Sequence, residues 1–245
     1  MSKTRAVLSA VLSLGLVGIG GQAATAAPVV FFGEDIGAGE STVLTSHPNA
    51  DAARAALFAN LVGVGTETFE SFLHGDPNPA VSFGTVTASL GGGEVGSVAS
   101  GSTNGFGRYG VSGTNFWESS STTSLTFSAP VAAFGFYGVD VGDFNGQVTL
   151  TTVSGSPLVL NVGNTVNSPG GGVLYFGFYV TNPDELFTGI SFGNTASGSD
   201  AFAFDDFSIG TLEQVAPQVP EPTSLVLLGG ALLGFAARRR GRNRA

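Results

Sequence analysis

The sequence contains no cysteine, so disulfide bonds cannot hold the fold together. Basic residues are also scarce, with nine Lys and Arg against eighteen Asp and Glu. All but two of the basic residues lie near the two ends of the chain, and the exceptions are Arg54 and Arg108. The part between the ends therefore carries a formal charge of about −16, which argues against nucleic acid and anionic lipid surfaces as partners. The stability of the region between the two ends therefore has to come from a hydrophobic core.

Charged residues make up only 11% of the chain, whereas phenylalanine and glycine are abundant, with 20 and 38 residues. The phenylalanines supply a large aromatic core. Many glycines with few charges indicate frequent turns between closely packed strands. Residues 27–212 are numerous enough to bury one core as a single domain. The composition predicts an all-β, jelly-roll-like β-sandwich of about nine to eleven strands with one short packed helix.

The N-terminus has the three parts of a secretory signal peptide. Lys3 and Arg5 precede an apolar stretch, residues 6–20, and the small residues Ala24-Thr25-Ala26 follow it. We expect residues 1–26 to be removed and the mature chain to begin near Ala27, outside the inner membrane.

The C-terminus ends in a polar, then apolar, then basic order. A proline-rich linker, residues 213–222, precedes an apolar run, residues 223–237, and a basic tail, residues 238–245. The run is shorter than the roughly 20 residues that a transmembrane helix needs. Because arginines adjoining a membrane segment stay in the cytoplasm, the tail predicts a short transmembrane segment that holds the precursor in the inner membrane.

Val219-Pro220-Glu221-Pro222, the apolar run and the arginines Arg238, Arg239 and Arg240 together resemble the C-terminal sorting signal of PEP-CTERM proteins. The resemblance implies export by a Gram-negative bacterium and processing by an exosortase-type enzyme. It also implies an association with exopolysaccharide, or with a biofilm matrix, at the cell surface or outside the cell. An ordinary C-terminal anchor that is never processed is the alternative interpretation.

One helix is predicted with Ser46 or Asn49 as its N-cap and Asp51 in its first turn. Alanines and leucines continue it to Leu61, and glycines follow at its end. Elsewhere the apolar residues alternate. Residues 173–180 are apolar on both faces, which predicts a strand covered on both sides. Residues 91–113 and 161–172 are expected to be loops. The clearest predicted strands are 131–139, 147–153, 173–180, 186–192 and 201–209.

The last predicted strand changes its apolar face. Phe202 and Phe204 share one parity, whereas Phe207 and Ile209 have the other. Regular pleating cannot produce this change, so we expect a β-bulge at Asp205-Asp206.

Acidic residues near the predicted bulge and near one turn suggest a metal site. Asp205 and Asp206 lie at the bulge with Asp200 shortly before them, while Asp140 and Asp143 lie in a predicted hairpin turn. Because calcium takes six to eight oxygen ligands, one hypothesis is a structural calcium ion held by these acids. The alternative is that one carboxylate of the bulge is solvated and the other accepts backbone N–H bonds.

A sugar-binding site is predicted at Arg108, Tyr109 and Trp117, because aromatic faces stack on sugar rings and these residues lie in a glycine-rich stretch. Burial of Trp117 within the sandwich is the alternative.

Three formal matches to catalytic motifs carry little weight. Gly189-Ile190-Ser191-Phe192-Gly193 has no helix or histidine after it, and Gly105 to Gly110 opens no helix. Glu67 and Glu70 would point to opposite faces of a strand, so they do not form a glycosidase pair. The sequence therefore predicts a non-catalytic exported surface or matrix protein. A lectin-like carbohydrate-binding module is the second interpretation, and a glycan hydrolase is a distant third.

Overall fold

The computed structural model describes residues 27–142, 145–194 and 201–216. Within these ranges the chain forms eleven strands, one α-helix and two short 3-10 helices. The all-β fold with one helix is as predicted. The elements are β1 Val29–Asp35, α1 Pro48–Phe58, β2 Thr66–Glu67, β3 Ala80–Phe83, β4 Val86–Ser97, β5 Asn115–Val131, β6 Ala133–Val139, β7 Gly146–Thr152, β8 Leu158–Asn161, β9 Val173–Tyr179, η1 Pro183–Glu185, β10 Phe187–Asn194, β11 Phe202–Gly210 and η2 Leu212–Gln214.

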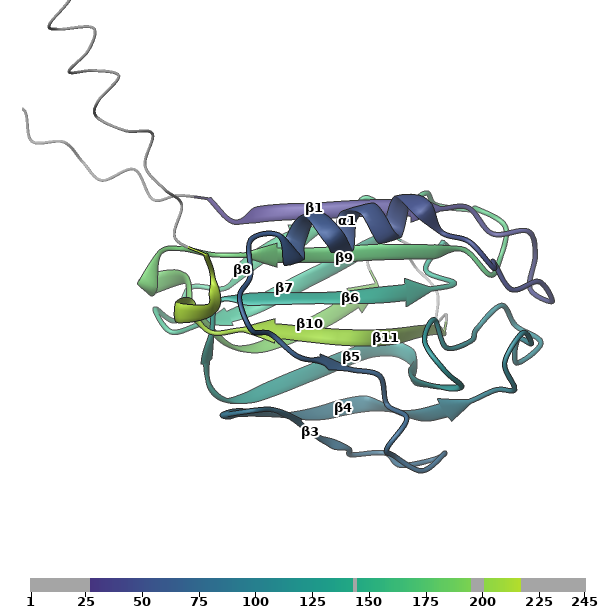
Figure 1. Ribbon diagram of the computed structural model, residues 1–245, viewed down its shortest axis with the longest axis horizontal. Coiled ribbons are helices and arrows are strands. Elements are labelled where there is room, and N and C mark those ends of the chain that lie inside the picture. Colours follow the sequence, from purple (N-terminus) through teal and green to yellow (C-terminus); the bar gives the residue numbers. More distant parts are fainter. Residues whose placement is uncertain (1–26, 143–144, 195–200, 217–245) are drawn as a thin grey trace, which may run out of the picture.

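A single antiparallel sheet curls into two layers (Figure 1), with the strand order β1-β9-β6-β11-β5-β10-β7-β8. The long strand β5 connects the layers. Near Trp117 it pairs with β11, and near Leu125 it pairs with β10. The first layer is therefore β1, β9, β6 and β11, and the second is β10, β7 and β8. β4 follows β5 from one layer to the other, and β3 extends the second layer at its edge.

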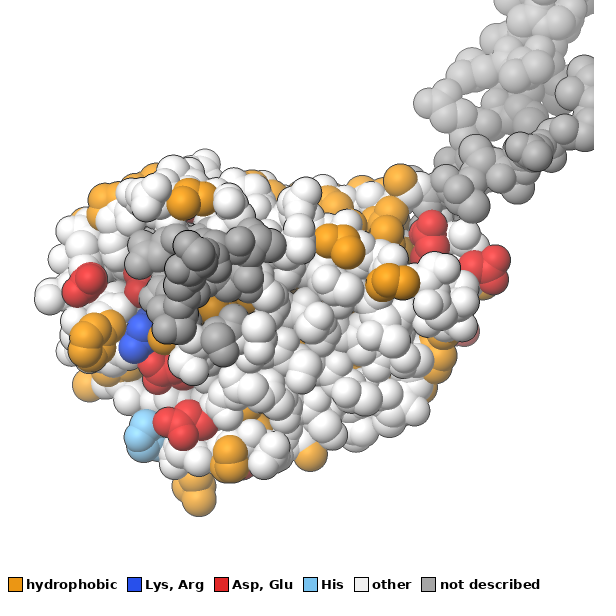
Figure 2. Space-filling model, turned by 180° about the vertical axis from the view of Figure 1, so that it is seen from behind, with side chains coloured by type: hydrophobic (Ala, Val, Ile, Leu, Met, Phe, Trp, Pro, Cys, Tyr) orange, Lys and Arg blue, Asp and Glu red, His pale blue; other side chains and the backbone are white. Residues whose placement is uncertain are grey.

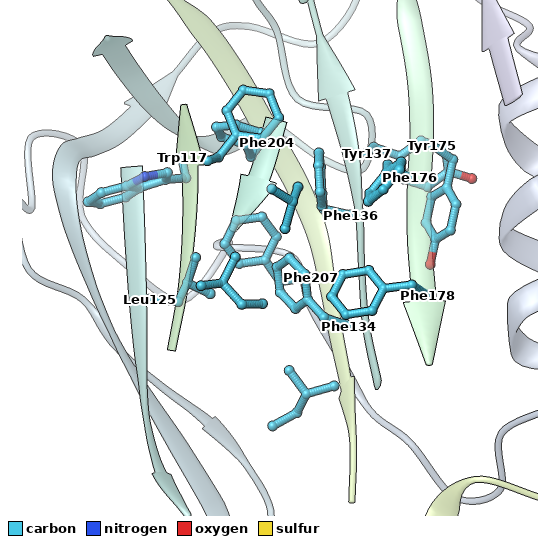
Figure 3. Close-up of a cluster of buried hydrophobic side chains, with 14 of the residues drawn as sticks. Trp117, Leu125, Phe134, Phe136, Tyr137, Tyr175, Phe176, Phe178, Phe204 and Phe207 are labelled. Atoms are coloured by element: carbon cyan, nitrogen blue, oxygen red, sulfur yellow. The ribbon is translucent and has the colours of Figure 1, made fainter. Parts of the chain in front are cut away.

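Phenylalanine rings fill the space between the layers (Figure 3). Phe136 and Phe204 meet edge to face at 5.1 Å between ring centroids, and Phe192 meets Phe204 at 4.8 Å. Burying one such side chain contributes about 1.5–3 kcal/mol. The aromatic core thus takes the place of the missing disulfides.

Helix α1 covers the outer face of the first layer over β1 and β9 (Figure 1). A Cβ atom at Gly177 would lie 2.7 Å from Leu57 Cδ2, and one at Gly135 would lie 2.8 Å from it. Glycine at both positions lets the helix approach the sheet closely. As predicted from its apolar pattern, β9 is buried on both faces: Phe176 and Phe178 face the core, and Tyr175 lies on the helix side.

The predicted N-caps of the helix are wrong. Neither Ser46 nor Asn49 caps α1, and the N-cap residue His47 makes no side-chain capping bond. The carboxylate of Asp35, at the end of β1, instead accepts the backbone N–H groups of Asn49 and Ala50 at 3.0 and 2.9 Å. A cap from a distant strand fixes the helix to the sheet as well as satisfying its first N–H groups.

Residues 91–97, predicted to be a loop, belong to strand β4. Gly93 and Gly96 make room for groups of β5 and do not mark a turn, and a Cβ atom at Gly93 would overlap the Glu118 carbonyl oxygen. A Cβ atom at Gly93 would lie 2.8 Å from the Trp117 ring, and one at Gly96 would lie 2.6 Å from the Phe116 ring.

Candidate functional site

The bulge predicted in the last strand is present. The register between β11 and β6 shifts between Asp205 and Ser208, and Asp206 has a positive φ of 51°. The extra residue lets Phe204 and Phe207 both reach the core. Asp205, next to Phe204 in the strand, consequently faces outward, toward the loop that joins β4 to β5.

Asp205 is nevertheless fully buried, because this loop covers it. Its carboxylate accepts the backbone N–H groups of Ser112, at 2.8 Å, and of Asp206, at 2.7 Å. Burial, and then the neighbouring charge of Asp206, raises the pKa of the Asp205 carboxyl well above its usual 3.8. The group is a structural acceptor that pins the loop to the sheet.

Asp206 is 8% exposed and has different partners. The Ser112 hydroxyl donates to one carboxylate oxygen, and Arg54 Nη2 lies 3.9 Å from the other. The same guanidinium donates to Thr66 Oγ1 at 3.3 Å. Asp206 therefore connects the bulge to helix α1 and to the segment around β2. The expectation that one acid of the pair is solvated is wrong, because both are buried.

The five acids of the predicted calcium site do not all lie within the described residues. Asp143 and Asp200 are outside them. Asp140 accepts the backbone N–H of Gly171 at 2.9 Å. Nowhere in the described ranges do three or more His, Asp or Glu side chains gather as metal ligands would. Calcium binding therefore stays a prediction. Melting curves recorded with excess chelator and with millimolar calcium would test it.

A pocket of about 350 Å³ opens between the segment before α1 and the loop that joins β4 to β5. Its wall combines hydroxyl groups, backbone and short apolar side chains. His47 lies in this wall, and its Nδ1 is 2.9 Å from Asp51 Oδ1, which also accepts the Tyr137 hydroxyl at 2.6 Å. The pocket is lined by Val43, Leu44, Thr45, His47, Val98, Ala99, Ser100, Gly101, Ser102, Tyr109, Gly110, Val111, Gly113 and Thr114.

The three residues of the predicted sugar site do not form one surface. Tyr109 lines the pocket but is only 4% exposed, and its hydroxyl donates to the Gly171 carbonyl at 2.9 Å. Arg108 Nε donates to Glu118 at 2.6 Å. Trp117 is fully buried in β5, where its Nε1 donates to Thr123 at 2.6 Å. The prediction of an exposed Trp117 is wrong, because its neighbours in β4 and β11 enclose the ring.

The carboxylates of Glu67 and Glu70 also accept backbone N–H groups. Glu67 accepts the N–H of Phe69 at 2.7 Å, and burial raises its pKa. Glu70 accepts the N–H groups of Thr114, at 2.8 Å, and of Asn115, at 2.6 Å. Both side chains therefore fix loop segments next to β5.

Immediately beyond the described body, residues 218–240 match the family model of the PEP-CTERM protein-sorting motif. The chain carries a PEP-CTERM sorting motif. The match includes Val219 to Pro222 and Arg238 to Arg240, as the order of these residues predicted. The PEP-CTERM motif implies export, a membrane-anchored precursor and processing by an exosortase.

The PEP-CTERM segment itself lies outside the described residues. In the ranges that the structure covers, no helix has the length and apolar character to cross a membrane. The predicted transmembrane segment, residues 223–237, is not among them.

No curated protein matches the chain. Solved structures with limited similarity include a family 22 carbohydrate-binding module of Clostridium thermocellum Xyn10B, 16% identical over 64% of this chain and 98% of that one, with a TM-score of 0.35. A family 11 module from a Clostridium thermocellum cellulase is 11% identical over 61% and 96%, with a TM-score of 0.29. A Stig cyclase from Fischerella is 15% identical over 70% and 98%, with a TM-score of 0.32. Scores this low carry no argument about function.

Sequence reasoning missed Ser112 and His47. Ser112 joins both acids of the bulge, and His47 lies in the pocket wall. Both lie outside the regular strands and helix, so no periodicity marks them. The acids bound by Ser112 are more than 90 residues away in the sequence, and the pocket that His47 lines is closed by a distant loop. The parity change at Asp205 was the one signal that pointed to this region.

Proposed function

We propose that this protein is a non-catalytic component of the bacterial surface or extracellular matrix, delivered by its PEP-CTERM motif and associated with exopolysaccharide. The observation that carries the proposal is the position of the motif. Its match begins at residue 218, directly after the described body ends at residue 216. A folded cargo followed by a sorting signal is the arrangement that export and later release require.

The proposed order of events follows the chain. Residues 1–26 direct export as a signal peptide, and residues 27–212 fold outside the inner membrane as an extracellular β-sandwich. Residues 213–222 act as a linker that presents Pro220-Glu221-Pro222 to an exosortase-type enzyme. Residues 223–237 hold the precursor in the membrane, and residues 238–245 stay in the cytoplasm until processing releases the body.

Two features support the non-catalytic part of the proposal. The two acids that the sequence offers for catalysis, Glu67 and Glu70, accept backbone N–H groups. The pocket beside α1 contains one histidine but no carboxylate in its wall. Acid–base chemistry needs a group that is free to exchange a proton with a substrate.

Intact mass spectrometry of the protein from the envelope and the medium tests the sorting step. We expect the wild-type mature chain to begin near Ala27 and to lack Arg238 to Ala245. Pro220→Ala combined with Glu221→Ala should retain the arginine tail. Pro217→Ala, one residue before the matched segment, is the matched control and should be processed normally. An intact C-terminus on most of the wild-type protein contradicts the proposal.

A lectin-like function is the second candidate, and the pocket beside α1 favours it. Hydroxyl groups of Thr45, Ser100 and Ser102 and the ring of Tyr109 could surround one sugar unit. Titration of the mature protein with oligosaccharides from the producing organism, followed by calorimetry, tests it. Ser102→Trp, which fills the pocket, should abolish binding, whereas Ser71→Trp, in an exposed turn, should not. Equal binding by both variants contradicts this candidate.

A further inference from the structure

The second layer carries no charged residue on its strands. β3, β7, β8 and β10 contain no Asp, Glu, Lys or Arg, and the only charges of β4 and β5 are Glu94 and Glu118. These two glutamates lie opposite each other in the part of β4 and β5 that belongs to the first layer. Within the described residues, the strands of the second layer thus carry no charge, although the body as a whole carries about −16.

Regular alternation places hydroxyl side chains on this face. In β5, Leu125 and Phe127 are buried, whereas Ser124 and Thr126 are exposed. In β10, Ser191 is exposed between the buried Ile190 and Phe192. The pleat thus directs the apolar residues inward and the hydroxyls outward.

Strand pairing arranges these hydroxyls in rows. Ser89 is opposite Thr126, which is opposite Gly189, and Gly189 is opposite Thr151. In the next row Ser124 is opposite Ser191, which is opposite Thr149. We name the set the hydroxyl face: Ser89, Ser124, Thr126, Thr149, Thr151 and Ser191.

The hydroxyl face is a regular grid. Neighbouring strands are about 4.8 Å apart, and successive outward residues along one strand are about 6.7 Å apart. Threonine is stiff about χ1, so its hydroxyl loses little freedom on binding. Seen from behind (Figure 2), the central surface that is not grey is mostly white with a few orange side chains, and red and blue side chains lie to its left and right.

The chemistry of the hydroxyl face selects among possible occupants. A charged polymer finds no counter-charge on it. A protein, or a second copy of this chain, finds no aromatic anchor among its six residues, and the exposed apolar neighbour opposite Thr149 is the small Val159. Stable protein interfaces depend on larger anchors. A neutral polysaccharide matches it, because hydroxyls can donate to and accept from sugar hydroxyls without the desolvation of a charge.

We propose that the hydroxyl face binds extended chains of a neutral polysaccharide. The inference rests on the proposed matrix function and names the surface and the polymer class. Single hydroxyl contacts are weak, but repeated contacts along one chain add through effective concentration. Long polymers should therefore bind, and monosaccharides should not compete.

Co-sedimentation of the purified mature protein with an insoluble neutral β-glucan tests the proposal, with alginate gel as the acidic comparison. We expect wild type to bind the glucan and not the alginate. Ser124→Asp with Ser191→Asp, which places two charges at the centre of the face, should weaken glucan binding at least tenfold. Ser41→Asp with Ser71→Asp adds the same charge at exposed turns and should bind like wild type.

A second variant covers the case in which added charge disturbs folding. Thr126→Val with Thr149→Val removes two hydroxyls but keeps the branched shape that suits a strand. It should melt near the wild-type temperature and bind the glucan several-fold less. The proposal would be overturned if both face variants bound the glucan like wild type, or if wild type bound alginate preferentially. It would also be overturned if wild type formed concentration-dependent dimers that the face variants do not form.

Fractionation of the native matrix separates the two proposals. If the Ser124→Asp, Ser191→Asp variant stays in the matrix with wild type, the hydroxyl face is not the contact, although the matrix function stands. If wild type itself is absent from the matrix, the proposed function fails whatever the face does.

Discussion

The two outer faces of the sandwich differ in what covers them and in the polar groups that they carry. The outer face of the first layer is covered by α1 and by the loop that joins β4 to β5, so Asp205 and Asp206 are buried beside the backbone N–H of Ser112 and the guanidinium of Arg54. The outer face of the second layer exposes hydroxyls such as Ser124, Thr126 and Ser191, and its described strands carry no charge. A covered face needs charged groups with partners inside the protein, whereas the partners of an uncovered face are water or a ligand. The first face thus contributes to stability and the second is available for contact.

Asp205→Ala should have the largest effect on stability. It leaves the N–H groups of Ser112 and Asp206 without an acceptor, and the free energy of unfolding should fall by about 2–4 kcal/mol. Asp205→Asn retains an acceptor oxygen and should lose less. Urea unfolding measures both, with the exposed Asp184→Ala as control. A loss below that of the control would show that the bulge acid is not structural.

The same carboxyl predicts a pH dependence. Because its pKa is raised in the folded state, the folded protein binds more protons than the unfolded one just above pH 3.8. Its contribution therefore stabilises the fold at the acidic end and is lost as pH rises through the folded pKa. Asp205→Asn should remove this part of the pH dependence of the unfolding free energy. Parallel unfolding profiles for wild type and variant between pH 4 and 7 would contradict the prediction.

Asp35→Ala should have a smaller effect, about 1 kcal/mol, because it removes the cap of α1 while water can reach the freed N–H groups. Loss of helix signal in circular dichroism on mild heating, before the main transition, is the expected signature. Asp184→Ala again serves as control, and a variant that melts like wild type would show that the cap is dispensable.

Thr126→Val should have the smallest effect, within about 0.5 kcal/mol, because its side chain is exposed on the hydroxyl face. Thr123→Val, three residues earlier in the same strand, should cost about 1–2 kcal/mol. It takes away the acceptor of the buried Trp117 N–H. Thermal melting compares the pair, and equal losses would mean that the outward hydroxyl is also structural.

Much of the fold follows from apolar periodicity. The parity change between Phe204 and Phe207 predicted the bulge, and the two-sided pattern of residues 173–180 predicted a strand covered on both faces. Strands β6, β7, β9, β10 and β11 all lie close to their predicted ranges. These signals are local, because side-chain direction in a strand depends on the pleat.

The errors have a common physical cause, which is contact between distant segments. Gly93 looked like a turn residue, but it makes room for the Trp117 ring. The cap of α1 comes from Asp35 on another element, so the nearby Asn49 misled the prediction. The edge strands β1 and β8 were not predicted, because they pair on one side only and keep exposed apolar residues such as Val30 and Val159. The pocket, which is built by two loops, had no signal in the sequence.

One paired measurement tests the division between the two faces most directly. Wild type, Asp205→Asn and the Ser124→Asp, Ser191→Asp variant are melted, and the same samples are sedimented with the neutral β-glucan at 25 °C. We expect Asp205→Asn to melt lower but to bind like wild type, whereas the face variant should lose at least tenfold in binding and melt somewhat lower, because its two aspartates lie opposite each other. Binding that is lost with Asp205→Asn and kept by the face variant would contradict this expectation.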